Sequence, residues 1–143
     1  MSEPSVPTLL AMLVCDQVII DQQTKKKSLI GVFDNINAIV FPAATNCAVY
    51  AKLADAEGQY KFKVRVVNLK DEQLLGEMEV GATVQTQTEP VDMAIYLMGI
   101  AFPTPGKYEV QLYANEVYLG RVTMRAIQLN VPGIPGVSPW QQH

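Results

Sequence analysis

Strict alternation of apolar and polar side chains over residues 60–66 constrains the fold of this chain more than any other feature of its sequence. The segment reads YKFKVRV, with lysine or arginine between the apolar residues. Because successive side chains of a β-strand point to opposite faces, the pattern predicts a strand with one buried and one solvated face. Residues 108–112 repeat the alternation, and the apolar residues 91, 93, 95 and 97 share one face of another strand.

Other apolar runs and the turns between them extend this pattern to the whole chain. Residues 12–14 and 18–20 are nearly continuous apolar runs, which is typical of a strand covered on both faces. A change of apolar face after Gly120 predicts a β-bulge in the last strand. Polar, glycine or proline turns separate the runs at residues 21–25, 55–58, 68–72, 103–106 and 114–116. We therefore predict an all-β fold, an immunoglobulin-like antiparallel β-sandwich of about eight strands.

Length and composition predict one domain with short tails. The 143 residues suffice for a single domain, and a hydrophobic content of 49% is enough for a buried core. We place the sandwich domain at residues 8–130, after an N-terminal tail of residues 1–7. Residues 131–143 form a C-terminal tail, because frequent proline and glycine there preclude a central strand.

Charge and hydropathy argue against a nucleic-acid or membrane partner. The net charge is −3, and the only run of cations, residues 25–27, lies in a predicted turn, where a solvated loop tip is expected. No apolar run approaches the ~20 residues of a membrane-spanning helix. Residues 9–15 look like the start of a lipoprotein signal but lack a positively charged flank, so we interpret them as a buried first strand. We expect a cytoplasmic protein.

The two cysteines, Cys15 and Cys47, belong to no Cys-x-x-Cys pair. A small secreted domain stabilised by disulfides would contain more of them. We expect two small buried hydrophobic residues in a reducing compartment. A Cys15–Cys47 bridge is left open, because the two strands can be neighbours in a sheet.

Residues suited to catalysis are scarce. His143, the last residue, is the only histidine, so no Ser-His-Asp or Cys-His arrangement can be built without it. Two cysteines and one histidine are also few for a zinc site. Glu77 and Glu79 share the solvent face of a predicted strand, which favours a solvated surface over acid–base chemistry. We expect no catalytic residues, no cofactor and no bound metal.

Acidic loop residues offer calcium binding as a further possibility. Asp55 and Glu57 lie in one predicted hairpin turn, and Asp34 precedes Asn35 in another loop. Loops at one end of a sandwich can gather carboxylates around calcium, but this spacing matches no defined calcium loop. Turn formation is the expected role. Residues 34–37 also interrupt a strand-like stretch, which predicts a strand break or bulge.

Gly106 and Tyr108 open a predicted strand directly after a proline-containing loop. This resembles the tyrosine corner of immunoglobulin-like sandwiches, in which a tyrosine near a strand start hydrogen-bonds to the backbone upstream. An ordinary core tyrosine is equally compatible with the pattern, and either role is structural. Val110 stands where antibody domains have a cysteine, which disfavours a true antibody-type domain.

Two blocks of the sequence resemble a family of small, uncharacterised bacterial proteins. The first block is CDQVIID at residues 15–21, followed by SLIGVFDNI at residues 28–36 and Phe41-Pro42. The second runs from GIAF at residues 99–102 through PGKY at residues 105–108 to YLGR at residues 118–121. The resemblance implies an immunoglobulin-like sandwich. It implies no activity, since none is known for the family, so no functional residues are carried over.

The C-terminal tail contains the residue best suited to an interaction. Trp140, the only tryptophan, follows Ile134, Val137 and Pro139. A stiff, apolar, proline-rich arm can lie across a neighbouring subunit with tryptophan as its anchor. It can also fold back over its own sheet or stay unordered. We therefore expect a non-catalytic binding or assembly module that forms homo-oligomers or binds a protein partner.

Two other functions are weighed against this one. The alternative is a sandwich that binds a small ligand or carbohydrate through end loops and through tyrosines such as Tyr50, Tyr96, Tyr113 or Tyr118. A hydrolase is the third hypothesis, and it would require several acidic side chains to converge in one deep cleft. Sandwich folds host many functions, so the fold alone does not decide between them.

Overall fold

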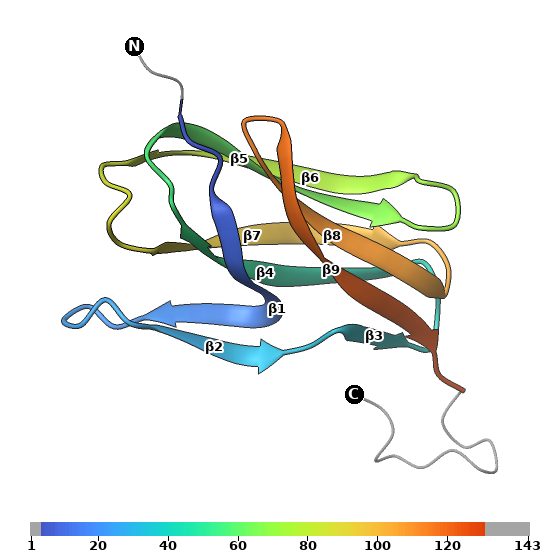
Figure 1. Cartoon of the computed structure of the whole chain (residues 1–143). Helices are drawn as coiled ribbons and strands as arrows, with labels where there is room; N and C mark the ends of the chain where they lie inside the picture. Colours follow the sequence, from blue (N-terminus) through green and yellow to red (C-terminus); the bar gives the residue numbers. More distant parts are fainter. Residues whose placement is uncertain (1–3, 131–143) are drawn as a thin grey trace.

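The computed structural model describes residues 4–130, and these form nine β-strands in two packed sheets (Figure 1). The predicted all-β, immunoglobulin-like sandwich is confirmed, and the strand count is close to the expected one. The strands are β1 (Thr8–Ile20), β2 (Lys27–Val32), β3 (Asn35–Ala38), β4 (Ala43–Ala54), β5 (Gly58–Asn68), β6 (Leu74–Val84), β7 (Val91–Phe102), β8 (Gly106–Ala114) and β9 (Val117–Gln128). None of the described residues lies in a helix long and apolar enough to cross a membrane.

The core lies between the two sheets. One sheet has four strands in the order β2-β1-β4-β7, and the other has five in the order β3-β9-β8-β5-β6. The alternation at residues 60–66 lies in β5 as predicted, with Phe62 and Val64 buried and Lys63 and Arg65 on the outer surface. Apolar residues at every second position of both sheets thus meet face to face. The largest buried side chains of this core include Leu53, Ile95, Leu97, Phe62, Tyr108 and Leu112.

The predicted interruption at residues 34–37 is the point where the chain changes sheets. β2 belongs to the four-stranded sheet, whereas β3, two residues later, pairs in parallel with β9 of the other sheet. The other strand pairs formed by residues 4–130 are antiparallel. The backbone N–H of Arg125 donates to the Asp34 carbonyl (2.9 Å), so pairing with β9 begins within the connection.

Tyr108 forms a tyrosine corner at the start of β8. Its side chain is fully buried, and its hydroxyl donates a hydrogen bond of 2.5 Å to the carbonyl oxygen of Thr104. Gly106, between the two, has a φ of 151°, which residues with a side chain rarely adopt. The Phe102 ring meets the Tyr108 ring edge to face, with 4.8 Å between centroids. Tyr108 and Gly106 therefore close one end of the core.

β9 contains a bulge near Gly120, as the sequence predicts. Leu112 lies opposite Gly120, and the next residue, Tyr113, lies opposite Tyr118, so Leu119 is the inserted residue. A Cβ atom at Gly120 would clash with Leu9 Cδ2. Glycine at the bulge therefore lets β1 of one sheet pass close to β9 of the other.

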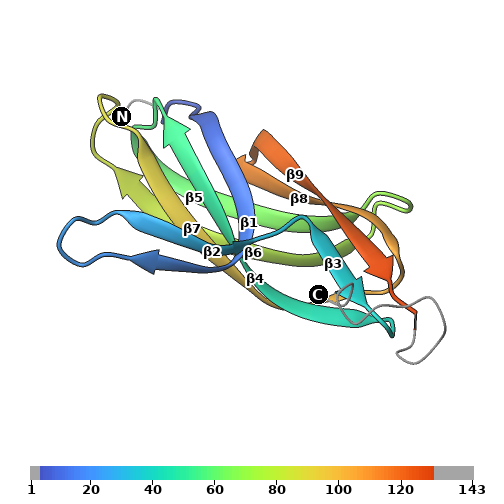
Figure 2. The same cartoon turned by 90° about the horizontal axis from the view of Figure 1, so that it is seen from below.

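The expectation that the apolar runs of β1 are covered on both faces is wrong. Leu13, Ile19 and Ile20 are 41%, 44% and 52% exposed. For Ile19 and Ile20 the reason is that β1 pairs with β4 only as far as Cys15 and with β2 from that residue onward. Beyond it, residues 16–32 form a hairpin, here called the arm, which leaves the sheet and crosses β4 and β7 on their outer side (Figures 1 and 2).

Candidate functional site

Apolar and backbone contacts hold the arm against the outer face of the four-stranded sheet. The Tyr96 hydroxyl of β7 donates to the carbonyl oxygen of Val18 (3.1 Å) and accepts from the N–H of the same residue (3.2 Å). The Val18 side chain is buried in a small cluster with Cys15 and Ala48, and Leu29 packs against it. The arm is therefore a third layer over part of the sandwich.

A charged contact holds the beginning of β2. Lys27 Nζ forms an ion pair with Asp92 Oδ1 of β7, and the Tyr50 hydroxyl donates to Asp92 Oδ2 (2.9 Å). The prediction that residues 25–27 form a solvated loop tip is wrong for Lys27, whose side chain is only 16% exposed. The arm brings this lysine against β7, whereas Lys25 and Lys26 are exposed.

The groups in this contact alter one another's protonation. Burial alone would raise the pKa of Asp92, but the hydrogen bonds from Lys27 and Tyr50 and the nearby positive charges outweigh it and hold the pKa below its usual value. Burial and the hydrogen bond to Asp92 raise the pKa of Tyr50 to about 12. At neutral pH Asp92 is therefore ionised and Tyr50 protonated, as both contacts require.

The outward side of the arm is apolar. It presents the outward patch, which we define as Ile19 and Ile30, with exposed fractions of 44% and 45%. The hairpin register pairs Val18 with Leu29 on the inner side, so Ile19 and Ile30 fall on the outer side. Their partners in the register are uncharged glutamine and serine. The patch is therefore an apolar surface without a charge inside it.

β2 lies at an edge of its sheet, with β1 as its only strand neighbour within residues 4–130. Natural edge strands are commonly protected by charged residues, prolines or bulges. β2 has one charged residue, Lys27, and Asp92 holds its ammonium group. Gly31 departs from strand geometry with a positive φ of 70°. The Asp16 carboxylate occupies the space that a side chain at Gly31 would need. Residues 28–30 thus form an open, uncharged edge.

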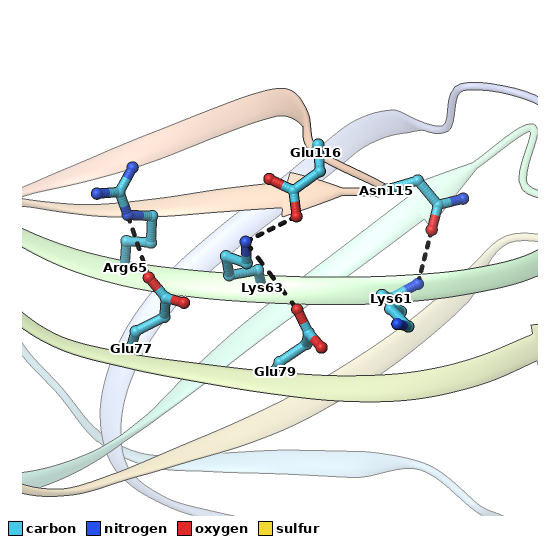
Figure 3. A network of polar contacts seen from close by, with 7 residues as sticks. All are labelled: Lys61, Lys63, Arg65, Glu77, Glu79, Asn115 and Glu116. Atoms are coloured by element: carbon cyan, nitrogen blue, oxygen red, sulfur yellow. Dashed lines mark hydrogen bonds and ion pairs between the residues drawn. The ribbon is translucent and has the colours of Figure 1, made fainter.

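The outer surface of the five-stranded sheet is charged instead, and several of its charges are paired (Figure 3). Lys63 Nζ lies 2.7 Å from Glu116 Oε1 and 4.0 Å from Glu79 Oε2. Arg65 Nε lies 3.4 Å from Glu77 Oε2. The hydrogen bond with Lys63 lowers the pKa of Glu116 and raises that of Lys63. Glu77 and Glu79 share the solvent face as predicted, and each stands beside a cation.

The four tyrosines considered for ligand binding lie on two opposite surfaces. Tyr50 is engaged with Asp92 and Tyr96 with the arm. Tyr113 and Tyr118 lie together on the outer surface of the five-stranded sheet, with 5.6 Å between ring centroids. The four tyrosines therefore do not line one pocket. Of the two pairs, only Tyr113 and Tyr118 form an aromatic surface.

Two of the hollows in the surface formed by residues 4–130 lie beside β7 or beside the arm and have mainly apolar linings. One of about 420 Å³ lies between β6 and β7 and is lined by Val80, Val84, Val91 and Met93 among others. The other, here called the lateral groove, has a volume of about 180 Å³ and lies between β1, β9 and the β2–β3 connection. Leu13, Val14, Val32, Phe33, Asp34 and Val122 line it.

Other residues singled out from the sequence do not form a site within the structure. Trp140, Ile134 and the rest of the tail 131–143 lie outside the described residues. Asp55 is engaged locally, since its carboxylate accepts from Thr8 (3.3 Å) and its carbonyl oxygen from Ser5 (2.6 Å). Within residues 4–130, no group of three or more His, Cys, Asp or Glu residues could hold a metal ion.

The two cysteines are buried and free. They lie on adjacent strands but on opposite faces of the sheet, since Cys15 pairs with Ala48 outside the core, while Cys47, one position earlier, belongs to the core. The bridge that the sequence left open is therefore not formed. Burial raises the pKa of Cys15 and raises that of Cys47 to about 11.

Sequence reasoning missed the residues that hold the arm. Lys27 and Asp92 are 65 positions apart, and Tyr96 is 78 positions from Val18. The one available signal was Asp92 itself, a lone acidic residue within an apolar strand, which needs a partner when it is partly covered.

The comparisons with known proteins concern the family and the fold. Residues 10–127 match the profile of a family of unknown function, DUF6941. An immunoglobulin-like protein from Pseudomonas aeruginosa is similar in structure at 11% sequence identity, with a TM-score of 0.44, over 87% of this chain and 97% of that one. No curated protein matches the sequence.

Proposed function

We propose that this chain, which belongs to the DUF6941 family, is a non-catalytic assembly module that pairs with a second copy of itself through the arm. The observation that carries the proposal is the open edge of β2 beside the outward patch. An edge with free backbone groups and exposed apolar side chains is the kind of surface to which another strand adds.

The absence of charge along residues 28–30 favours a second copy as the partner. Each copy carries a net charge of −3, so two copies repel unless they meet where charge is absent. Residues 28–30 carry no charge, and Lys27 is held by Asp92. Two β2 strands related by a twofold axis would run antiparallel and bring the two Ile30 side chains together, in a closed dimer.

Sedimentation velocity over a range of protein concentrations tests this pairing. We expect a dimer for the wild type and a monomer for Ile30→Lys, because a charge at the centre of the edge disfavours a neighbouring strand. Leu74→Lys is the matched control, since Leu74 on β6 is 42% exposed and Ile30 is 45% exposed. A wild type that stays monomeric at high concentration would overturn the proposal.

Two further observations support the absence of catalysis and a cytoplasmic location, which are also part of the proposal. The acidic residues on the surface of the five-stranded sheet stand beside cations, which suits a structural surface better than acid–base catalysis. Two unpaired thiols suit the reducing conditions of the cytoplasm, the location that we propose.

A second candidate function, carbohydrate binding, is supported by the aromatic pair on the five-stranded sheet. Tyr118 is 46% exposed beside Tyr113, and Arg121 with Glu109 supplies polar groups nearby. Screening on a glycan array tests it, with Tyr118→Ala expected to lose binding and Met78→Ala on β6 as the control. An array without any bound glycan would contradict this candidate.

A further inference from the structure

The larger apolar hollow lies at the open side of the sandwich, between the edge strands of the two sheets. β6 ends the five-stranded sheet and β7 ends the four-stranded sheet, and residues 85–90 connect them (Figure 1). The hollow, here called the edge hollow, is lined by residues 80, 82–86 and 89–93 and has a volume of about 420 Å³. This volume falls within the range of roughly 300–1,000 Å³ that is usual for small-molecule sites.

The inner lining of the edge hollow is apolar. Val84, Val91 and Met93 are partly buried and pack against the core, as Val80 does. Ala82 shares the face of Val80 and Val84 on β6, because the side chains of a strand alternate, yet it is exposed. Its small side chain leaves open the space that a larger residue would fill. The edge hollow therefore offers an apolar ligand contact with the margin of the core.

One charge on the lining of the edge hollow has no partner. The lining includes two carboxylates, Glu89 and Asp92, and no lysine or arginine. Asp92 is neutralised by its ion pair with Lys27. Glu89 is exposed, and among residues 4–130 it forms no ion pair. An apolar hollow whose remaining charge is a carboxylate is complementary to an apolar molecule with one positive group.

We propose that the edge hollow binds a small amphiphilic amine, a molecule with an apolar body and one ammonium group. The body lies against Val84, Val91 and Met93, and the ammonium group pairs with the Glu89 carboxylate. An aliphatic amine resembles the lysine side chain, with a pKa of about 10.4, so it is charged at neutral pH. This inference does not rest on pairing through β2, because the edge hollow and residues 28–30 belong to different elements.

Three probes with the same alkyl chain test the preference for a positive charge. At neutral pH octylamine is positive, octanol is neutral and octanoate is negative. We expect octylamine to bind most tightly, octanol roughly three- to tenfold more weakly, and octanoate more weakly still, since a charge pair that is open to water adds only a modest advantage. Titrations followed in amide NMR spectra, below the aggregation concentration of each probe, measure the affinities. The signals of residues 80–93 should move.

Two variants with matched controls locate the binding site. Glu89→Gln keeps the shape of the side chain and removes its charge, so octylamine should bind to it no more tightly than octanol does. Glu72→Gln is its control, because Glu72 is also exposed but lies outside the edge hollow. Ala82→Phe fills the hollow, so binding of all three probes should be lost. Ala101→Phe is its control, since it adds the same ring at an exposed position of β7 outside the hollow.

Several results would overturn this inference. They are equal affinities of the wild type for octylamine and octanol, signals that move only in residues 16–32 of the arm, and no movement at millimolar octylamine. Octylamine binding that is unchanged in either variant would also overturn it. If circular dichroism shows that Ala82→Phe does not fold, Glu89→Gln alone decides. Sedimentation velocity without a probe measures the pairing through β2, so failure of octylamine binding leaves the proposed function standing.

Discussion

A single side chain, Tyr96, satisfies both backbone polar groups of Val18. Its hydroxyl accepts from the Val18 N–H and donates to the Val18 carbonyl, at 3.2 and 3.1 Å. A neighbouring strand normally supplies such bonds, but β1 has left β4 three residues earlier, at Cys15. Tyr96 thus takes the place of a strand partner and fixes the arm to the sheet.

Replacing Tyr96 by phenylalanine should loosen the arm and leave the sandwich intact. The variant leaves two backbone groups of Val18 without their partner, which costs about 1–3 kcal/mol where water cannot replace it. We expect faster amide hydrogen exchange within residues 17–31 and unchanged exchange in β5 and β8. Tyr118→Phe on the opposite surface is the control. Identical exchange of the arm in the two variants would show that Tyr96 does not hold it.

Acid should weaken the contact at Asp92. The pKa of Asp92 in the folded protein is lower than in the unfolded chain, where it is about 3.9. Ionised Asp92 therefore stabilises the folded protein at pH values above the unfolded-state pKa. This stabilisation is lost as the pH falls through the folded-state pKa. The free energy of unfolding of the wild type should therefore exceed that of Asp92→Asn at neutral pH, and the difference should narrow below a pH of about 4. Urea unfolding of both proteins at a series of pH values measures this difference in the free energy of unfolding. A difference that is independent of pH would contradict the assignment.

The sandwich could be predicted because its signals are local. Phe62, Val64 and the cations between them fall into register by chain geometry alone, and a strand with this alternation needs a second apolar layer. The bulge at Gly120 follows from the same reasoning, since a change of apolar face within one strand requires an inserted residue.

The arm could not be predicted because its signals are not local. The apolar run Val18-Ile19-Ile20 is the same whether one face or both faces are covered. Whether one face or both faces are covered depends on the bend after Cys15. It also depends on the contacts of the arm with Asp92 and Tyr96, which are distant in the sequence. The open edge of β2 is a consequence of that bend, so the candidate assembly surface was also hidden.

Both thiols should react slowly in the folded protein. Cys15 and Cys47 are buried on opposite faces of one sheet, and the pKa of Cys47 is about 11, so little thiolate forms at neutral pH. We expect slow reaction with Ellman's reagent under native conditions and two titratable thiols per chain after denaturation without reductant. The single variants Cys15→Ala and Cys47→Ala separate the two rates. A denatured chain without free thiols would reveal a bridge.

Removing the hydroxyl of Tyr108 should destabilise the whole sandwich. Tyr108 is buried and its bond to the Thr104 carbonyl is partly buried, so in Tyr108→Phe this acceptor loses its partner, at a cost of about 1–3 kcal/mol. Tyr113→Phe is the matched control, because the Tyr113 hydroxyl donates to the side chain of Gln111 on the outer surface, where water can replace it. We expect the urea midpoint of the first variant to fall well below that of the second. Equal midpoints would mean that Tyr108 acts through the packing of its ring alone, since both variants keep the ring and differ only in which hydrogen bond is lost.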